Sequence, residues 1–240
     1  MKALLTKGIA SPKLAKDQTY LTYILYLASA AYRPELCPNA GDCIQYCLIT
    51  KAGRGAIGGP DNTVQRARKR KSDWLLSDRA SFVGQLRKEI RNAIRLARKI
   101  GMPLAIRLNG GSDLDWSDVY EHFEDEAIIF WEYTKRPELA LKLNRMKNVH
   151  VTYSQNERTT PRILGAMLTA QINVAMVFHI RRGKALPTHV GTVPVLDGDL
   201  TDLRFLDVRG SVVGLRLKSL RKVQSTNTAF IQAVPIANVA

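Results

Sequence analysis

The stretch that decides the fold runs from residue 127 to residue 179 and reads AIIFWEYTKRPELALKLNRMKNVHVTYSQNERTTPRILGAMLTAQINVAMVFH. In it, short apolar runs alternate with helical patterns: Ala127–Tyr133, then Pro137–Met146; Val149–Tyr153, then Thr160–Ala170; then Val174–His179. Strand alternating with helix is typical of βα units around a parallel sheet. The stretch therefore predicts an α/β fold.

The same rhythm extends towards the N-terminus. Leu104–Leu108 is a further strand, followed by a helical pattern at Ser117–Phe123, and the aromatic and branched run Tyr20–Leu27 is the first buried strand. Between these strands we expect a basic helix at Asn62–Leu76, capped by Asp61 or Asn62, and an amphipathic helix at Asp78–Ile100 with Ser77 as its N-cap and Gly101 as its stop. At least five strands result, which suits a full or partial (β/α) barrel of parallel strands.

From Arg182 onward the pattern changes to short strands, at Thr192–Leu196, Leu203–Leu206 and Val212–Leu217. We expect one domain over residues 1–240. It would contain an N-terminal arm at 1–19, a βα-repeat barrel at 20–182 with a cysteine loop at 29–59, and a C-terminal extension at 183–240 that closes the barrel or forms a lid.

Composition excludes several classes of protein. The chain has 240 residues, of which 45% are hydrophobic, and a chain of this size buries roughly 70% of its unfolded surface, so wholesale disorder is excluded. The apolar run Tyr20–Ala31 is too short to span a bilayer, and the first seven residues are too poor in apolar side chains for a secretion signal. We expect a soluble, cytoplasmic protein with no membrane contact.

The charge indicates an anionic partner. Lys and Arg number 36 against 21 Asp and Glu, giving a net charge of +15, for which nucleic acid is the first candidate. Three basic stretches stand out, at Arg66–Lys71, Arg87–Lys99 and Arg204–Lys222, although each can also be a solvated helix or strand face. We expect non-specific phosphate contacts above all from the first stretch, through Arg66, Arg68, Lys69, Arg70 and Lys71.

All three cysteines, Cys37, Cys43 and Cys47, fall within one loop. A chain without an export signal is normally reduced, and an odd count argues against an internal disulfide, so the loop more readily places thiolates around a metal. Structural zinc takes four ligands, and none of the histidines is near in sequence. A [4Fe–4S] cluster held by three cysteines leaves one iron open, so we favour that cluster, with zinc or purely structural cysteines as alternatives.

Polar clusters follow the middle strands at the point where each strand ends. These clusters are Asn109–Asp113, Thr134–Arg136, Ser154–Arg158 and His179–Arg182. Each can be ordinary turn chemistry, and a lone His179 is more often a rim residue than a ligand. Because the carboxyl ends of parallel strands meet at one face, four such clusters together predict a pocket there.

At these residues the chain resembles radical S-adenosylmethionine (radical-SAM) enzymes, whose cysteines are spaced C-x3-C-x2-C with an aromatic residue before the last. Here the spacing is C-x5-C-x3-C, and Tyr46 supplies the aromatic. From Tyr20 to Lys222 the chain is more similar to a phage-encoded family of unassigned activity that itself resembles these enzymes. The matching blocks are Cys37-Pro38…Cys43…Cys47, Lys51–Gly55, Arg107–Asp113, Tyr133–Pro137, Tyr153–Glu157 and Asp197–Asp199 with Asp202–Phe205.

The resemblance implies a [4Fe–4S] cluster on Cys37, Cys43 and Cys47, with S-adenosylmethionine bound beside it. Gly110-Gly111-Ser112 lies where these enzymes carry a Gly-Gly-Glu-like strand end, and Asp113 could replace the missing acid. Lys135 and Glu157 are candidates for the ribose or carboxylate of the ligand. The implied cofactor-binding set is Tyr46, Asn109, Gly110, Gly111, Ser112, Asp113, Lys135, Ser154 and Glu157.

Three hypotheses follow. The first is a radical-SAM-like enzyme that works on or near nucleic acid in the cytoplasm of a phage host. The second is a basic DNA- or RNA-binding phage protein whose iron–sulfur or zinc site is only structural. The third is a degenerate barrel that keeps the cluster and has lost S-adenosylmethionine binding, which the missing acid suggests.

Overall fold

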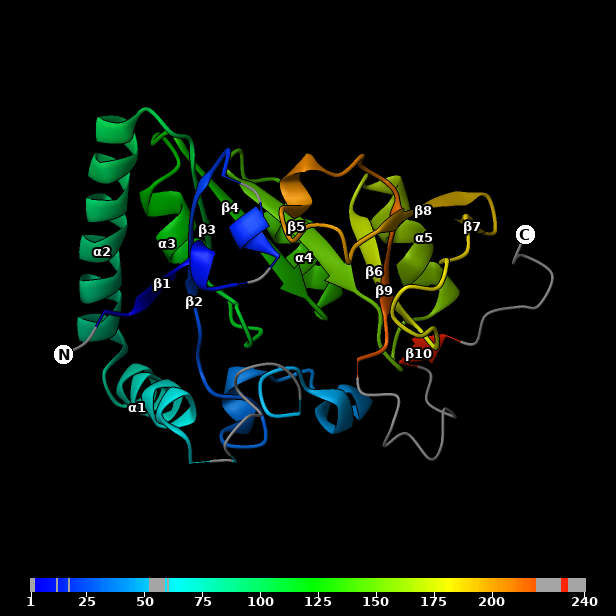
Figure 1. Cartoon of the computed structure of the whole chain (residues 1–240), viewed down its shortest axis with the longest axis horizontal. Coiled ribbons are helices and arrows are strands. Elements are labelled where there is room, and N and C mark those ends of the chain that lie inside the picture. Colours follow the sequence, from blue (N-terminus) through cyan, green and yellow to red (C-terminus); the bar gives the residue numbers. More distant parts are fainter. Residues whose placement is uncertain are drawn as a thin grey trace.

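A computed structural model describes residues 3–11, 13–16, 18–51, 59, 61–218 and 230–232. Its centre is a ten-stranded sheet in the order β1-β2-β3-β4-β5-β6-β9-β8-β7, with β10 beside β6 (Figure 1). The strands are β1 Leu5–Lys7, β2 Leu21–Leu25, β3 Leu104–Arg107, β4 Ile128–Thr134, β5 Val149–Ser154, β6 Asn173–Phe178, β7 His189–Val190, β8 Val193–Asp197, β9 Val212–Arg216 and β10 Ile231–Gln232.

The sheet is mostly parallel and open. The β1–β2 and β7–β8 pairings are antiparallel, and the other pairings between described strands are parallel. The two ends of the strand order, β1 and β7, are not paired with each other in the described sheet. The α/β class is therefore confirmed, whereas a fully closed barrel is not what the described strands form.

Within the described ranges, five α-helices lie between the strands: α1 Thr63–Ser77, α2 Arg79–Ile100, α3 Ser117–His122, α4 Pro137–Leu143 and α5 Pro161–Thr169. The Asn62 side chain caps α1 by accepting from the N–H of Gln65 at 2.9 Å. Asp78 caps α2 by accepting from the N–H of Ser81 at 3.0 Å, so the prediction of Ser77 as the cap was wrong by one residue. Gly101 ends α2 in the left-handed region, with φ +67°.

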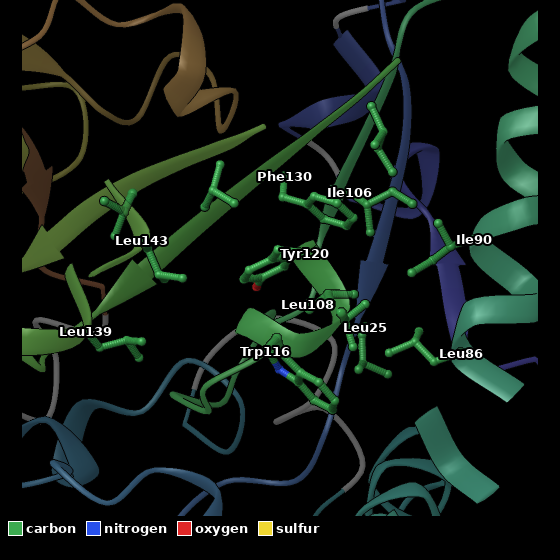
Figure 2. Packing of buried hydrophobic residues seen from close by; sticks show 14 of the residues in the cluster. Leu25, Leu86, Ile90, Ile106, Leu108, Trp116, Tyr120, Phe130, Leu139 and Leu143 are labelled. Atoms are coloured by element: carbon green, nitrogen blue, oxygen red, sulfur yellow. The ribbon is translucent and has the colours of Figure 1, made fainter. Parts of the chain in front are cut away.

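The main core lies between the sheet and its helices (Figure 2). Side chains alternate along a strand, so Ile106 of β3 and Phe130 of β4 point to the helix side. The face of α2 that carries Leu86 and Ile90 packs there, as does Tyr120 of α3 (Figure 2). The three- and four-residue spacing of apolar positions in α2 thus becomes one buried face, as predicted.

The opposite face of the sheet is covered by two segments outside the βα units. A second cluster contains Leu14 from the N-terminal segment, Leu203 from the segment after β8, and Trp131 of β4. Phe205 packs edge-on against Trp131, with ring centroids 5.8 Å apart. Both faces of the parallel strands are therefore buried, which explains their nearly continuous apolar sequences.

Several boundaries differ from the sequence prediction. The N-terminal arm contributes β1, which pairs with β2, and β9 lies beside β6 inside the sheet rather than in a peripheral extension. Leu203–Leu206 is not a strand, since Arg204–Leu206 forms a 3-10 helix. The basic residues Arg221 and Lys222 and residues 52–58 of the cysteine loop lie outside the described residues. No helix in the described ranges has the length and apolar character needed to cross a bilayer.

Candidate three-cysteine site

The cysteine loop lies across the carboxyl-terminal edge of the sheet, where the arrowheads of the parallel strands point (Figure 1). The N–H of Asp113, after β3, donates to the carbonyl oxygen of Leu36 at 2.8 Å. A Cβ added to Gly111 would overlap the side chain of Ile49, on the far side of the loop. The absence of a side chain at residue 111 therefore lets the loop approach the end of β3 closely.

The backbone of Lys135, directly after β4, is held by three neighbouring segments. Its N–H donates to Asp113 Oδ2 at 3.0 Å, and its carbonyl oxygen accepts from Asn39 Nδ2 at 3.4 Å and from Asn156 Nδ2 at 3.3 Å. Asn39 belongs to the cysteine loop and Asn156 follows β5. Lys135 is thus the point at which the loop and the ends of β3, β4 and β5 are joined. Sequence reasoning missed both asparagines, although Asn156 stands in a polar cluster that it did identify.

The three cysteines are free and partly buried, and they share one electrostatic environment. Burial raises the pKa of the Cys37 thiol to about 11, although the nearby Lys135 ammonium lowers it. Burial alone would lower the pKa of Lys135, but Cys43, Cys37 and Asp113 raise it above its ordinary value. The loop therefore places the three thiols within electrostatic range of one lysine. Within the described ranges, however, no three His, Cys, Asp or Glu side chains are close enough together to hold a single metal ion.

Two carboxylate oxygens near this site are buried without a hydrogen-bond partner in the described structure: Asp113 Oδ1 and Glu157 Oε2. The Glu157 carboxylate lies against the Cα of Gly41 in the cysteine loop, since a Cβ added to Gly41 would overlap it. A buried acceptor left without a donor costs about 1–3 kcal/mol. These two oxygens are therefore the groups best placed to receive a donor or a cation from a ligand.

Other members of the expected cofactor-binding set are already engaged within the protein. Asn109 Oδ1 accepts from Ser112 Oγ at 2.8 Å and from the N–H of Leu114 at 3.0 Å. Gly110 packs so closely on β2 that an added Cβ would lie 2.7 Å from the carbonyl oxygen of Leu25. Asn109, Gly110 and Ser112 therefore shape the turn after β3, and their role in contacting a ligand stays a prediction.

The last two members of that set lie further along the edge of the sheet. Ser154 ends β5 and is half-buried. Tyr46 stacks on Phe230, with ring centroids 6.2 Å apart. The two residues after Phe230 form β10, which pairs with the end of β6. The cysteine loop thus reaches from the end of β2 to the end of β6.

The basic run in α1 does not form a continuous phosphate-binding surface. Arg68 Nη1 donates to the carbonyl oxygen of Ile49 at 3.1 Å, and Lys71 Nζ donates to that of Leu4 at 3.0 Å. Burial lowers the pKa of Lys71 to about 8. Lys69 pairs with Asp61 at 2.6 Å. The side chains of Arg66 and Arg70 are exposed, so the run offers fewer open cations than its sequence implied.

A buried acid in β4 holds the backbone at the end of β3, and sequence reasoning missed it because it lies inside an apolar strand. Glu132 of β4 is fully buried and accepts from the N–H of Leu108 at 2.8 Å and from the N–H of Asn109 at 3.1 Å. Tyr120 Oη donates to it at 2.5 Å. Burial raises the pKa of Glu132 to about 7, although these hydrogen bonds and the nearby Arg107 lower that pKa. Glu132 thereby fixes the point at which β3 turns towards Asp113.

Comparisons with known proteins identify one family. A search of curated proteins and a search of solved structures each returned no match. The family model described as Gene product 88 matches residues 3–233, which is nearly the whole chain. This agrees with the phage-encoded family expected from the sequence blocks, whereas the resemblance to radical-SAM enzymes stays a prediction. The chain belongs to the Gene product 88 family.

Proposed function

We propose that this chain is an iron–sulfur protein of radical-SAM type, in which Cys37, Cys43 and Cys47 hold a [4Fe–4S] cluster and S-adenosylmethionine binds beside it. The observation that carries the proposal is the docking of the cysteine loop over the ends of β3, β4 and β5, which places three free thiols within electrostatic range of Lys135. When bound and reduced by an external one-electron donor, a cluster with one open iron would supply the electron that cleaves S-adenosylmethionine to methionine and a carbon-centred radical.

The donor set consists of three free thiols, and a cluster held by three thiolates leaves one iron open. In such a cluster each thiolate binds a different iron, so the three sulfur atoms need not meet at one ion. Lys135 places a positive charge beside ligands that carry negative charge as thiolates. The unpartnered oxygens of Asp113 and Glu157 suit the ammonium group of S-adenosylmethionine.

The first experiment measures iron and sulfide in the chain purified and reconstituted without oxygen. We expect close to four irons per chain, with broad visible absorbance from iron–thiolate bonds. Cys43→Ser should abolish the colour. Glu35→Gln, an exposed change in the same loop, should leave it intact and is the matched control. A colourless chain carrying stoichiometric zinc would overturn the proposal.

The second experiment measures S-adenosylmethionine binding to the reconstituted chain by calorimetry. Asp113→Asn and Glu157→Gln should weaken binding by about ten- to a hundredfold each, the value of a charged hydrogen bond, with unchanged iron content. If the iron-loaded wild-type chain takes up no S-adenosylmethionine, the second half of the proposal fails and the degenerate-barrel hypothesis replaces it.

A further inference from the structure

The structure divides the cations of this chain into two groups. Several of those on α1 and α2 are engaged within the fold: Arg79 pairs with Asp118 at 2.8 Å, Arg98 pairs with Glu126 at 2.5 Å, and Arg91 contacts His122 at 2.8 Å. The two arginine–carboxylate pairs add little stability, but they neutralise part of the charge that an external anion would meet. The two helices therefore contribute less to an anion-binding surface than the net charge of +15 on the whole chain suggests.

The second group lies at the carboxyl-terminal edge of the sheet, and we call it the strand-end rim. It consists of Arg158 after β5, Arg181, Arg182 and Lys184 after β6, and Lys218 after β9. All five are exposed, and none of their side chains forms an ion pair or hydrogen bond within the described ranges. The stretches outside these ranges contain a single acidic residue, Asp17, so their sequence offers little to neutralise the rim.

Two rim cations, Arg182 and Lys218, lie within electrostatic range of each other. Partial burial of the otherwise exposed Lys218 side chain lowers its pKa, as do Lys13 and Arg182, whereas Asp199 and Asp202 raise it. The backbone that carries Arg181–Lys184 is fixed: the N–H of His179 donates to the carbonyl oxygen of Gln232 at 3.0 Å, and Arg216 Nε donates to that of Lys184 at 2.8 Å. Unpaired cations held near one another on a fixed backbone provide a surface ready for an anionic polymer.

The rim adjoins the three-cysteine site. Arg158 directly follows Glu157, whose carboxylate contacts Gly41 of the cysteine loop. At the other end of the loop, Tyr46 stacks on Phe230, two residues before the carbonyl that binds His179. A polymer lying on the rim would therefore run past the cysteine loop.

We propose that the strand-end rim binds nucleic acid through its phosphates and presents it to the three-cysteine site. An anionic membrane is a poorer fit, because the described residues 179–184 include no large exposed apolar side chain to anchor in a bilayer. Only the second half of this proposal, presentation of the nucleic acid to the three-cysteine site, rests on the proposed function. Binding itself needs no cluster and is measured with and without iron.

The probe is a fluorescein-labelled 30-base-pair DNA duplex, titrated by fluorescence anisotropy at several salt concentrations. The rim variant combines Arg158→Gln, Arg181→Gln, Arg182→Gln and Lys184→Gln. The control removes four exposed helix charges through Arg66→Gln, Lys88→Gln, Arg95→Gln and Lys99→Gln, so both variants have the same net charge. Circular dichroism and iron content establish that both fold and load as the wild type does.

We expect the rim variant to bind at least tenfold more weakly than the control. The magnitude of its slope of log K against log salt should fall by about 3.6 if all four cations contact phosphates, since each duplex phosphate contact contributes about 0.9. A matching single strand of DNA or RNA is expected to show the same ranking of variants. Equal affinity of the rim variant and the wild type would overturn the proposal, as would an equal or larger loss in the control. Anionic phosphatidylserine vesicles that displace the duplex at equal phosphate concentration would overturn it in favour of a membrane surface. Rim-dependent binding by a chain that takes up no iron would support the rim while refuting the cluster.

Discussion

The buried acid Glu132 makes the stability of this protein depend on pH in an unusual direction. Its pKa is about 7 in the folded chain, against an ordinary 4.5 that it regains on unfolding. The folded state therefore holds the proton more tightly than the unfolded state. The contribution to stability is fully present below pH 4.5 and is lost as the pH rises through 7.

The magnitude follows from the size of the shift. One pKa unit corresponds to about 1.4 kcal/mol, so between pH 5 and pH 8 the ionisation of Glu132 lowers the free energy of unfolding by about 2 to 3 kcal/mol. Histidines such as His122 and His150, whose pKa values burial lowers below 6.5, add stability as the pH rises, so they mask this effect in the wild type alone. The comparison with Glu132→Gln removes them, because they are common to both chains.

The assay is urea denaturation of the wild type and of Glu132→Gln at pH 5, 6, 7 and 8, followed by tryptophan fluorescence. The variant keeps one acceptor oxygen for Tyr120 and Leu108, so we expect a folded chain. The advantage of the wild type over the variant should shrink by about 2 to 3 kcal/mol from pH 5 to pH 8. A difference that is constant over this range would refute the reasoning, since it would mean that Glu132 titrates at the same pH in both states.

Three further predictions concern local packing and the thiols. Gly110→Ala should lower the free energy of unfolding by about 1–3 kcal/mol, because the Leu25 carbonyl leaves no room for a Cβ. Gly84→Ala lies in the exposed interior of α2 with open space around it, so it should raise the free energy of unfolding by about 0.5–1 kcal/mol. Thermal denaturation measures both changes. Asn148→Ala should cost about 1–2 kcal/mol, because the Asn148 amide donates to the last carbonyls of the α3 turn at 3.1 Å, and an unchanged urea midpoint would contradict this. In the metal-free chain, the rate of Cys37 alkylation by iodoacetamide should keep rising with pH up to about 11, because the thiol stays protonated at pH 8. Peptide mass spectrometry measures the rate, and a plateau near pH 8 would disprove the prediction.

The sequence was most informative where one face of an element repeats. The apolar positions of α2 predicted its extent to within a residue, and its cap was misplaced only because Ser77 and Asp78 can both accept an N–H. At Leu203–Leu206 the apolar pattern covers only four residues, and Leu203 would be buried in a strand and in a helical turn alike. Such a short pattern does not distinguish the two structures. The position of β9 beside β6 depends on pairing between distant segments, which no local pattern encodes.

The candidate site shows a similar division. Polar clusters after the strands lie at the edge where the loop docks, because parallel strands bring their carboxyl ends together, and the pocket that they suggested stays a prediction. Phosphate contacts from the basic run in α1 stay a prediction. Helical periodicity places Arg68, Ser72 and Leu75 on one face of α1, and that face is turned inward, so local pattern alone did not separate the engaged cations from the exposed ones. Glu132 had no sequence signal, because a carboxylate within an apolar strand has meaning only once its donors are known.

The contact between Tyr46 and β10 imposes an order on assembly during synthesis. Translation runs from the N-terminus, so the cysteines leave the ribosome well before Phe230 and the two residues that pair with β6. Until Phe230 emerges, the nascent loop lacks the ring on which Tyr46 stacks. A product truncated before residue 230 would carry all three thiols without that ring, so synthesis of residue 230 precedes completion of the site.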